Sequence, residues 1–160
     1  MYKIGFIGSG KMASAIIKGL IKTGFAKPEE LIATQAETEG VEEKSKELGI
    51  KIILDNKELA KNSEIIFVAT KPNQAVGALE EIKDLITSDK LVASIAAGVT
   101  TEKLEAHLPE KTRVIRIMPN TPALVGEGMS GMVGGKYATE KDLEYIKNLL
   151  STIGKCIVVD

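Results

Sequence analysis

The stretch of sequence that decides the fold is Ile4-Gly5-Phe6-Ile7-Gly8-Ser9-Gly10-Lys11-Met12-Ala13. Its second part is a Gly-x-Gly-x-x-Ala turn that follows an apolar strand and opens a helix, the context that a dinucleotide-binding loop requires. Gly8 permits the tight turn, Gly10 lets the backbone approach a pyrophosphate, and Ala13 is small enough for close helix–sheet packing. The amino end of the helix offers free N–H groups and a positive dipole to phosphates. A plain strand-to-helix turn is the alternative, but spacing and context favour a cofactor loop formed by Gly8, Ser9, Gly10, Lys11, Met12 and Ala13.

The rest of the chain alternates short runs rich in Ile, Val and Leu with longer stretches of helical period, which is typical of β-α-β units. Strands are predicted at residues 3–7, 31–34, 51–54, 64–69, 91–95, 113–118, 130–133 and 156–159. Helical spacing indicates one helix from near Lys11 to a stop at Gly24 and a second that includes Leu79, Ile82 and Ile86. A third includes Leu143, Ile146 and Leu150, after a capping-box-like start at Thr139 and Asp142. Further helices are predicted at 37–48, 56–61 and 101–108. The expected fold is one Rossmann-type α/β domain over residues 1–160, with three layers: a mainly parallel sheet and helices on both faces.

The composition is that of a soluble globular protein, with 44% hydrophobic and 27% charged residues. The formal net charge is -1, from 21 basic and 22 acidic residues, so neither a nucleic acid nor an anionic membrane gains electrostatic support as a partner. No apolar run approaches the roughly 20 residues that span a bilayer, and the chain begins at once with a strand pattern rather than a signal peptide. We expect a cytoplasmic protein that acts on a small molecule.

The end of the second predicted strand bears on the choice between NAD and NADP. NAD-binding domains place an acid there to bind the ribose 2′-OH, whereas this chain has Thr34 and Gln35. Glu37 comes slightly late and is interpreted as a residue of the first helical turn. Without the acid a 2′-phosphate is not repelled, and Thr34 and Gln35 could donate hydrogen bonds to it. NADP is therefore favoured, and NAD remains possible because no arginine follows this strand to bind a 2′-phosphate.

Three further segments each lie just beyond the carboxyl end of a predicted strand, the edge where open α/β sheets bind ligands. They are Ala69-Thr70-Lys71-Pro72, Ala96-Ala97-Gly98 and Met118-Pro119-Asn120-Thr121-Pro122. Singly, each is typical of an ordinary turn, with a helix-starting proline in the two segments that contain one. Together with the glycine-rich turn, these three segments predict a cleft that binds the nicotinamide of the cofactor.

The remaining reactive side chains give weaker signals. His107, the only histidine, is predicted to lie at the surface, and Glu37, Glu39, Glu42 and Glu43 are interpreted as a solvated helix face. No spacing of His and Cys suggests a metal site. Cys156 lies in an apolar run and is predicted to be a buried, inert thiol.

Taken in order, residues 4–13, 70–72, 94–99, 113–122 and 125–128 resemble the pyrroline-5-carboxylate reductases. This family reduces the cyclic imine 1-pyrroline-5-carboxylate to L-proline with NADPH or NADH. The resemblance implies that residues 9–12 bind pyrophosphate and that Thr34 and Asn56 bind the adenosine end. It places residues 69–71, Ala97 and Gly98 at the ribose and nicotinamide, and Asn120 and Thr121 nearest the reacting carbon.

Members of this family continue into a helical second domain that dimerises and carries most substrate-binding residues. Nothing of that kind follows Asp160, so the chain is expected to be the cofactor half of an enzyme that is homo-oligomeric through a domain absent here. A sensor that holds NADP without turnover is one alternative. Another Rossmann reductase, such as a deazaflavin-dependent NADP oxidoreductase, is a second, although it explains the glycine-rich turn better than residues 118–122.

Overall fold

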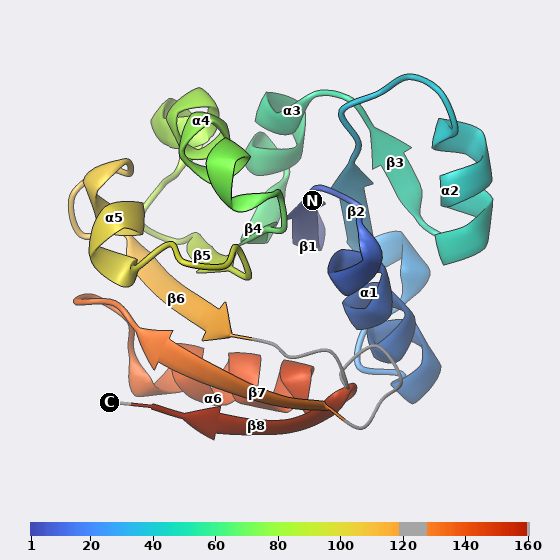
Figure 1. The fold of residues 1–160 in the computed structure, drawn as a ribbon. Helices are drawn as coiled ribbons and strands as arrows, with labels where there is room; N and C mark the ends of the chain where they lie inside the picture. Colours follow the sequence, from blue (N-terminus) through green and yellow to red (C-terminus); the bar gives the residue numbers. More distant parts are fainter. Residues whose placement is uncertain (119–127, 160) are drawn as a thin grey trace.

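A computed structural model describes residues 1–118 and 128–159, and these residues form an eight-stranded sheet with helices on both faces (Figure 1). The strands are β1 Tyr2–Ile7, β2 Leu31–Thr34, β3 Lys51–Ile53, β4 Ser63–Val68, β5 Leu91–Ser94, β6 Arg113–Met118, β7 Gly128–Gly134 and β8 Gly154–Val158. The helices are α1 Lys11–Thr23, α2 Val41–Leu48, α3 Asn56–Lys61, α4 Pro72–Ile82, α5 Thr101–Ala106 and α6 Glu140–Leu150, with 3-10 turns η1 Pro28–Glu30 and η2 Lys83–Leu85.

The sheet has the strand order β3-β2-β1-β4-β5-β6-β7-β8. Strands β1 to β6 run parallel, whereas β7 is antiparallel to β6 and β8 is parallel to β7. The chain therefore passes outward from β1 to β3 on one side and then crosses to β4 on the other side. In a parallel sheet this reversal opens a crevice between the strands that flank it, here β1 and β4.

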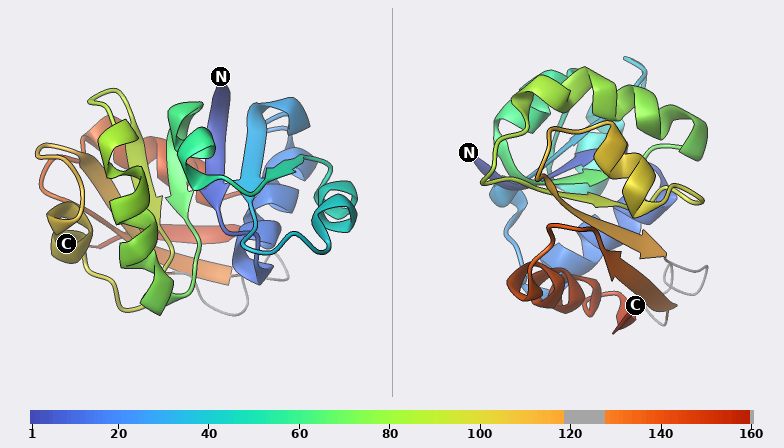
Figure 2. Two further views of the ribbon diagram at one scale, coloured as in Figure 1. Left: turned by 90° about the horizontal axis from the view of Figure 1, so that it is seen from above. Right: turned by 90° about the vertical axis from the view of Figure 1, so that its left-hand side faces the viewer.

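Alternation along the strands supplies one hydrophobic core for each face. Phe6 and Phe67 lie side by side on one face, with ring centroids 5.0 Å apart, and pack with α1, α2 and α6. Ile66 and Val68 point to the other face and pack with α3, α4 and α5. The side view in Figure 2 shows these three layers, with α4 on one side of the sheet and α1 and α6 on the other.

The predicted strands are confirmed, each with its ends within two residues of the predicted positions, and the α3 bounds are those predicted. Gly24 ends α1 in the left-handed conformation, at φ 78°. Three expectations about helices are corrected: α2 begins at Val41 rather than 37, α4 ends at Ile82 although the helical spacing extends to Ile86, and α5 ends at Ala106 rather than 108. The sheet is mainly parallel, as predicted, and β7 and β8 run against the other strands. The late start of α2 has a local cause, because Gly40 takes a left-handed φ of 77° immediately before it.

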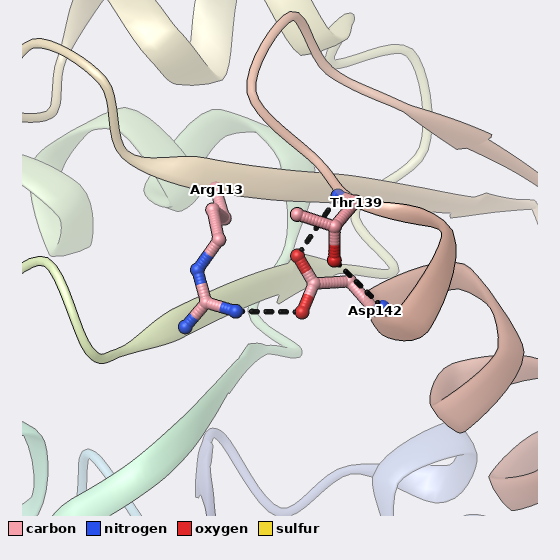
Figure 3. A network of polar contacts seen from close by, with 3 residues as sticks. All are labelled: Arg113, Thr139 and Asp142. Carbon is pink, nitrogen blue, oxygen red and sulfur yellow. Dashed lines mark hydrogen bonds and ion pairs between the residues drawn. The ribbon is translucent and has the colours of Figure 1, made fainter.

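The predicted capping box at the start of α6 is present (Figure 3). The Thr139 hydroxyl accepts from the Asp142 N–H at 3.1 Å, and Asp142 Oδ2 accepts from the Thr139 N–H at 3.0 Å. The other carboxylate oxygen, Oδ1, accepts from Arg113 Nη1 at 2.7 Å. Asp142 is 7% exposed, so this carboxylate links the start of β6 to the start of α6 in a nearly buried site.

Within the described ranges, no helix is long and apolar enough to cross a lipid bilayer.

Candidate functional site

An open groove of about 260 Å³ lies where the strand order reverses, at the carboxyl ends of β1, β2 and β4. Its lining combines residues from four separate segments of the chain: Ile7, Gly8, Ser9, Gly10, Thr34, Gln35, Ala36, Leu54, Asn56, Ala69, Thr70, Lys71 and Gln74. The structure thus brings together the glycine-rich turn, the end of β2 and the segment after β4, as the sequence predicted.

Gly8 is required by the fold itself. Its φ is +103°, which L side chains rarely adopt, and a Cβ there would lie 2.8 Å from the Ala69 carbonyl oxygen. A backbone hydrogen bond joins the carboxyl ends of β1 and β4 here, because the Ala69 N–H donates to the Ile7 carbonyl at 2.8 Å. The Gly8 N–H in turn donates to Thr34 Oγ1 at 3.2 Å. The turn therefore has a fixed backbone, held by β4 on one side and by β2 on the other.

Gly10, in contrast, is not required by the fold. Its backbone is extended, with φ -73° and ψ -169°, and a Cβ there would meet no atom within 4 Å. Gly10 borders the groove and directly precedes α1, whose first N–H groups have no acceptor within the helix. The open space beside Gly10 is where a pyrophosphate would approach the backbone.

A second helix presents its amino end to the groove. Helix α4 begins with Pro72, and its N-cap residue Lys71 makes no side-chain capping bond. Thr70 Oγ1 is buried and has no hydrogen-bond partner among the described residues, although Thr70 lines the groove. Lys71 is the one cationic side chain in that lining. An unpartnered hydroxyl, a helix amino end and a cation together fit an anionic ligand.

The end of β2 is organised by side chains that bind the protein's own backbone. Thr34 is 3% exposed and its hydroxyl accepts from Gly8. Gln35 Nε2 donates to the carbonyls of Glu37, at 2.8 Å, and Glu39, at 2.6 Å. The amide N–H groups of Gln35 are therefore already used by its own loop, whereas the Gly8 bond uses Thr34 Oγ1 as an acceptor and leaves its O–H for another partner. The expectation that Glu37 lies in the first turn of a helix is wrong, since α2 begins at Val41; of the four glutamates only Glu42 and Glu43 are helical.

Several predicted site residues lie outside the groove lining. Lys11, Met12 and Ala13 form the first turn of α1, Pro72 opens α4, and Ala97 and Gly98 follow β5. Asn120 and Thr121, with the neighbouring Pro119 and Pro122, lie outside the described residues.

The groove also includes Ile7, Ala36, Leu54 and Gln74, which sequence reasoning did not select. Leu54 could have been selected from the sequence, because it ends the predicted strand 51–54 at the same carboxyl edge; in the structure it is 48% exposed.

Other titratable groups lie away from this groove. His107 Nδ1 lies 2.6 Å from Glu80 Oε1, and this hydrogen bond lowers the pKa of Glu80. Cys156 is buried, as predicted, and burial raises the pKa of its thiol. In residues 1–118 and 128–159 no group of three or more His, Cys, Asp or Glu side chains could hold a metal ion.

The sheet order, the turn at Gly8 and the groove define a dinucleotide-binding domain of the Rossmann type. The family model described as "NADP oxidoreductase coenzyme F420-dependent" matches residues 3–98, and the chain belongs to this family.

Curated relatives extend the similarity over nearly the whole chain. The pyrroline-5-carboxylate reductase of Methanosarcina acetivorans is 42% identical over 157 residues, which are 98% of this chain and 58% of the relative. The Escherichia coli enzyme of the same name is 37% identical over 157 residues, which are 98% of this chain and 58% of the relative. The resemblance predicted from the motifs is thus confirmed, and the chain spans somewhat more than half the length of these relatives.

Solved structures agree. A pyrroline-5-carboxylate reductase from Coxiella burnetii has a TM-score of 0.93 at 32% identity, over 99% of this chain and 59% of the other. The Plasmodium falciparum pyrroline carboxylate reductase, solved with NADP bound, has a TM-score of 0.87 at 30% identity. The match covers 99% of this chain and 58% of the other. Prephenate dehydrogenase from Aquifex aeolicus shares the fold, with a TM-score of 0.81 at 14% identity. The match covers 100% of this chain and 62% of the other.

Proposed function

We propose that residues 1–160 are the NAD(P)-binding domain of a pyrroline-5-carboxylate reductase, which reduces 1-pyrroline-5-carboxylate to L-proline with NADPH. The observation that carries the proposal is the groove at the β1–β4 reversal, in a chain of which 98% matches a relative of that name at 42% identity. Further support comes from the Coxiella burnetii structure, whose backbone follows this one with a TM-score of 0.93.

In this proposal the groove residues and the predicted site residues outside its lining together hold the cofactor. Residues 8–13 bind the pyrophosphate through backbone N–H groups, and Thr34, Gln35 and Asn56 border the adenosine end. Residues 69–72 with Ala97 and Gly98 surround the nicotinamide and its ribose, and Asn120 and Thr121 lie nearest the reacting carbon. When bound, the cofactor supplies the hydride. The work of these side chains is to orient it, since hydride transfer to an imine depends on positioning.

We propose NADP as the favoured cofactor and NAD as a second one. The support is that β2 ends without an acid, at Thr34 and Gln35, and that the Plasmodium falciparum relative was solved with NADP bound. We further propose a cytoplasmic setting and, as the resemblance implies, a homo-oligomeric enzyme.

A different reductase is the second candidate, because the matching family model describes coenzyme F420-dependent NADP oxidoreductases. That match ends at residue 98, whereas the named relatives cover 98% of the chain. Assaying NADPH oxidation with the cyclic imine and, separately, with oxidised F420 distinguishes the two.

The testing experiment combines calorimetry with an assay of NADPH oxidation. We expect the 160-residue chain to bind NADPH or NADH at millimolar concentration or below, because the whole groove is formed by its own residues. We expect its turnover of 1-pyrroline-5-carboxylate to be far below that of the full-length Methanosarcina acetivorans relative, because the chain spans 58% of that enzyme's length. No binding of either cofactor would refute the proposal. Turnover within about tenfold, a barrier difference of about 1.4 kcal/mol, would place the substrate site in this domain.

A further inference from the structure

The side chain of Gln35 is held in one orientation by the loop that follows it. A glutamine amide has two N–H hydrogens, and Nε2 of Gln35 lies 2.8 Å from the Glu37 carbonyl and 2.6 Å from the Glu39 carbonyl. The reverse orientation would place Oε1 against two carbonyl oxygens, which repel it. The backbone is fixed as well, because the Gln35 N–H donates to the Ile53 carbonyl at 3.1 Å. The loop therefore decides which amide atom remains available.

The atom that remains available is an acceptor. Gln35 lines the groove beside Ala36 and Asn56. Its Oε1 accepts no hydrogen bond from a described residue, and it is not among the buried polar atoms that lack partners. Oε1 is thus a solvent-accessible carbonyl oxygen on a residue at the adenosine end of the groove.

The surrounding charges do not select for a phosphate at this end. Glu37 and Glu39 are exposed acids of the same loop. The cation of the groove lining, Lys71, belongs to the segment after β4, next to the amino end of α4. An acceptor oxygen receives a hydrogen bond from a hydroxyl, whereas a phosphate dianion offers only further acceptors.

We propose that Gln35 Oε1 accepts a hydrogen bond from the adenosine ribose 2′-OH and thereby admits NAD(H) to a groove that also takes NADP(H). Gln35 then replaces the acid that usually ends the second strand, but without its charge, so that a 2′-phosphate is tolerated rather than excluded. This inference rests on the proposed cofactor groove and assigns cofactor choice within it.

The test compares NADH and NADPH affinities, by calorimetry, for the wild-type chain and two variants. Gln35→Met preserves length and removes the acceptor. We expect the ratio of the NADH Kd to the NADPH Kd to rise about threefold to tenfold, the usual loss for one neutral hydrogen bond. Gln35→Glu retains an acceptor and adds a charge, so the ratio should fall about tenfold or more as NADPH binding weakens. Loss of the loop bonds affects both cofactors and therefore cancels in the ratio.

The matched control is Gln74→Met, which alters the same type of side chain in the same groove but on α4; its Kd ratio should equal the wild-type ratio. A Gln35→Met ratio that is unchanged, or that falls because NADPH binding suffers more, would overturn the inference while leaving the groove assignment intact. If the wild-type chain bound neither cofactor, the proposed function itself would fail. Should Gln35→Met not fold, as judged by circular dichroism, Gln35→Glu decides alone: a ratio that does not fall overturns the inference.

Discussion

Two concave regions lie at opposite ends of the same strands, and the larger one is not the candidate site. The groove at the carboxyl ends measures about 260 Å³. A hollow of about 600 Å³ lies at the amino ends, where Tyr2, Leu31 and Lys51 are the first residues of β1, β2 and β3. Volume therefore does not identify the binding region of this molecule, and the chemistry of the lining has to decide.

The two linings differ in which helix ends they present. Helices α1 and α4 begin at or beside the groove, so N–H groups and the positive ends of their dipoles face it. The carboxyl end of α2 lies at the hollow, and Gly49, the C-cap residue of α2, is part of the lining of the hollow. Carbonyl groups and a negative dipole end repel a pyrophosphate. A parallel sheet thus makes its carboxyl edge attractive to anions and its amino edge unattractive.

The strongest test of this contrast is Gly10→Val. A Cβ at Gly10 meets no protein atom, so we expect the unfolding free energy to change by no more than about 1 kcal/mol, mainly from the altered N-cap. We expect the affinity for NADPH to fall at least about hundredfold, because the side chain occupies the space where the pyrophosphate approaches the backbone. Calorimetry and thermal unfolding measure the two effects.

Gly77→Ala is the control for Gly10→Val, since a Cβ at Gly77, within α4, also meets no atom within 4 Å and Gly77 is outside the groove lining. It should bind NADPH normally. Normal binding by Gly10→Val would show that the phosphates lie elsewhere.

A smaller effect is expected from matched lysines at the two edges. Lys71 lines the groove and Lys51 lines the hollow, and both are exposed. Lys71→Ala should weaken NADPH binding about twofold to fivefold, the range of a solvent-exposed charge pair, and less in 1 M salt because the interaction is screened. Lys51→Ala should leave the Kd unchanged. Equal effects of the two substitutions would remove the distinction between the edges.

The smallest effect on binding is expected from Asp142→Asn, far along the sheet from the groove. The variant retains an oxygen that can accept from Thr139 but loses the charge that pairs with Arg113 at 2.7 Å (Figure 3). We expect a stability loss of about 1–3 kcal/mol, because Arg113 loses its charged partner in a nearly buried site. NADPH affinity should stay within twofold. A tenfold loss of affinity without unfolding would show that the β6–α6 region is coupled to the groove.

The sequence predicted the parts of this molecule that depend on local patterns. The turn at Gly8 and Gly10, the cap at Thr139 and the stop at Gly24 each depend on a few neighbouring residues, and all are present. The sequence also predicted that the segment after β4 lies at the carboxyl edge of the sheet, because the carboxyl ends of parallel strands meet at one edge.

What the sequence did not reveal depends on contacts between distant or irregular segments. The irregular loop before α2, which ends at the left-handed Gly40, is held by Gln35, whose side chain donates to two carbonyls of that loop. The hydrogen bond between Gly8 and Thr34 joins residues 26 positions apart, and no periodicity predicts it. The reversed direction of β7 likewise depends on pairing with β6 rather than on the pattern of its own residues.

The central claim is that the groove at the β1–β4 reversal binds the dinucleotide, and an NMR titration of the ¹⁵N-labelled chain with NADPH tests it most directly. The account predicts saturable shifts of the backbone amides that border the groove: Gly8, Ser9, Gly10, Gln35, Ala36, Asn56, Thr70, Lys71 and Gln74. The amides of Tyr2, Ser45, Gly49 and Lys51, which line the larger hollow, should not move. Shifts centred on the hollow, or saturable binding that leaves the groove amides unchanged, would contradict the account.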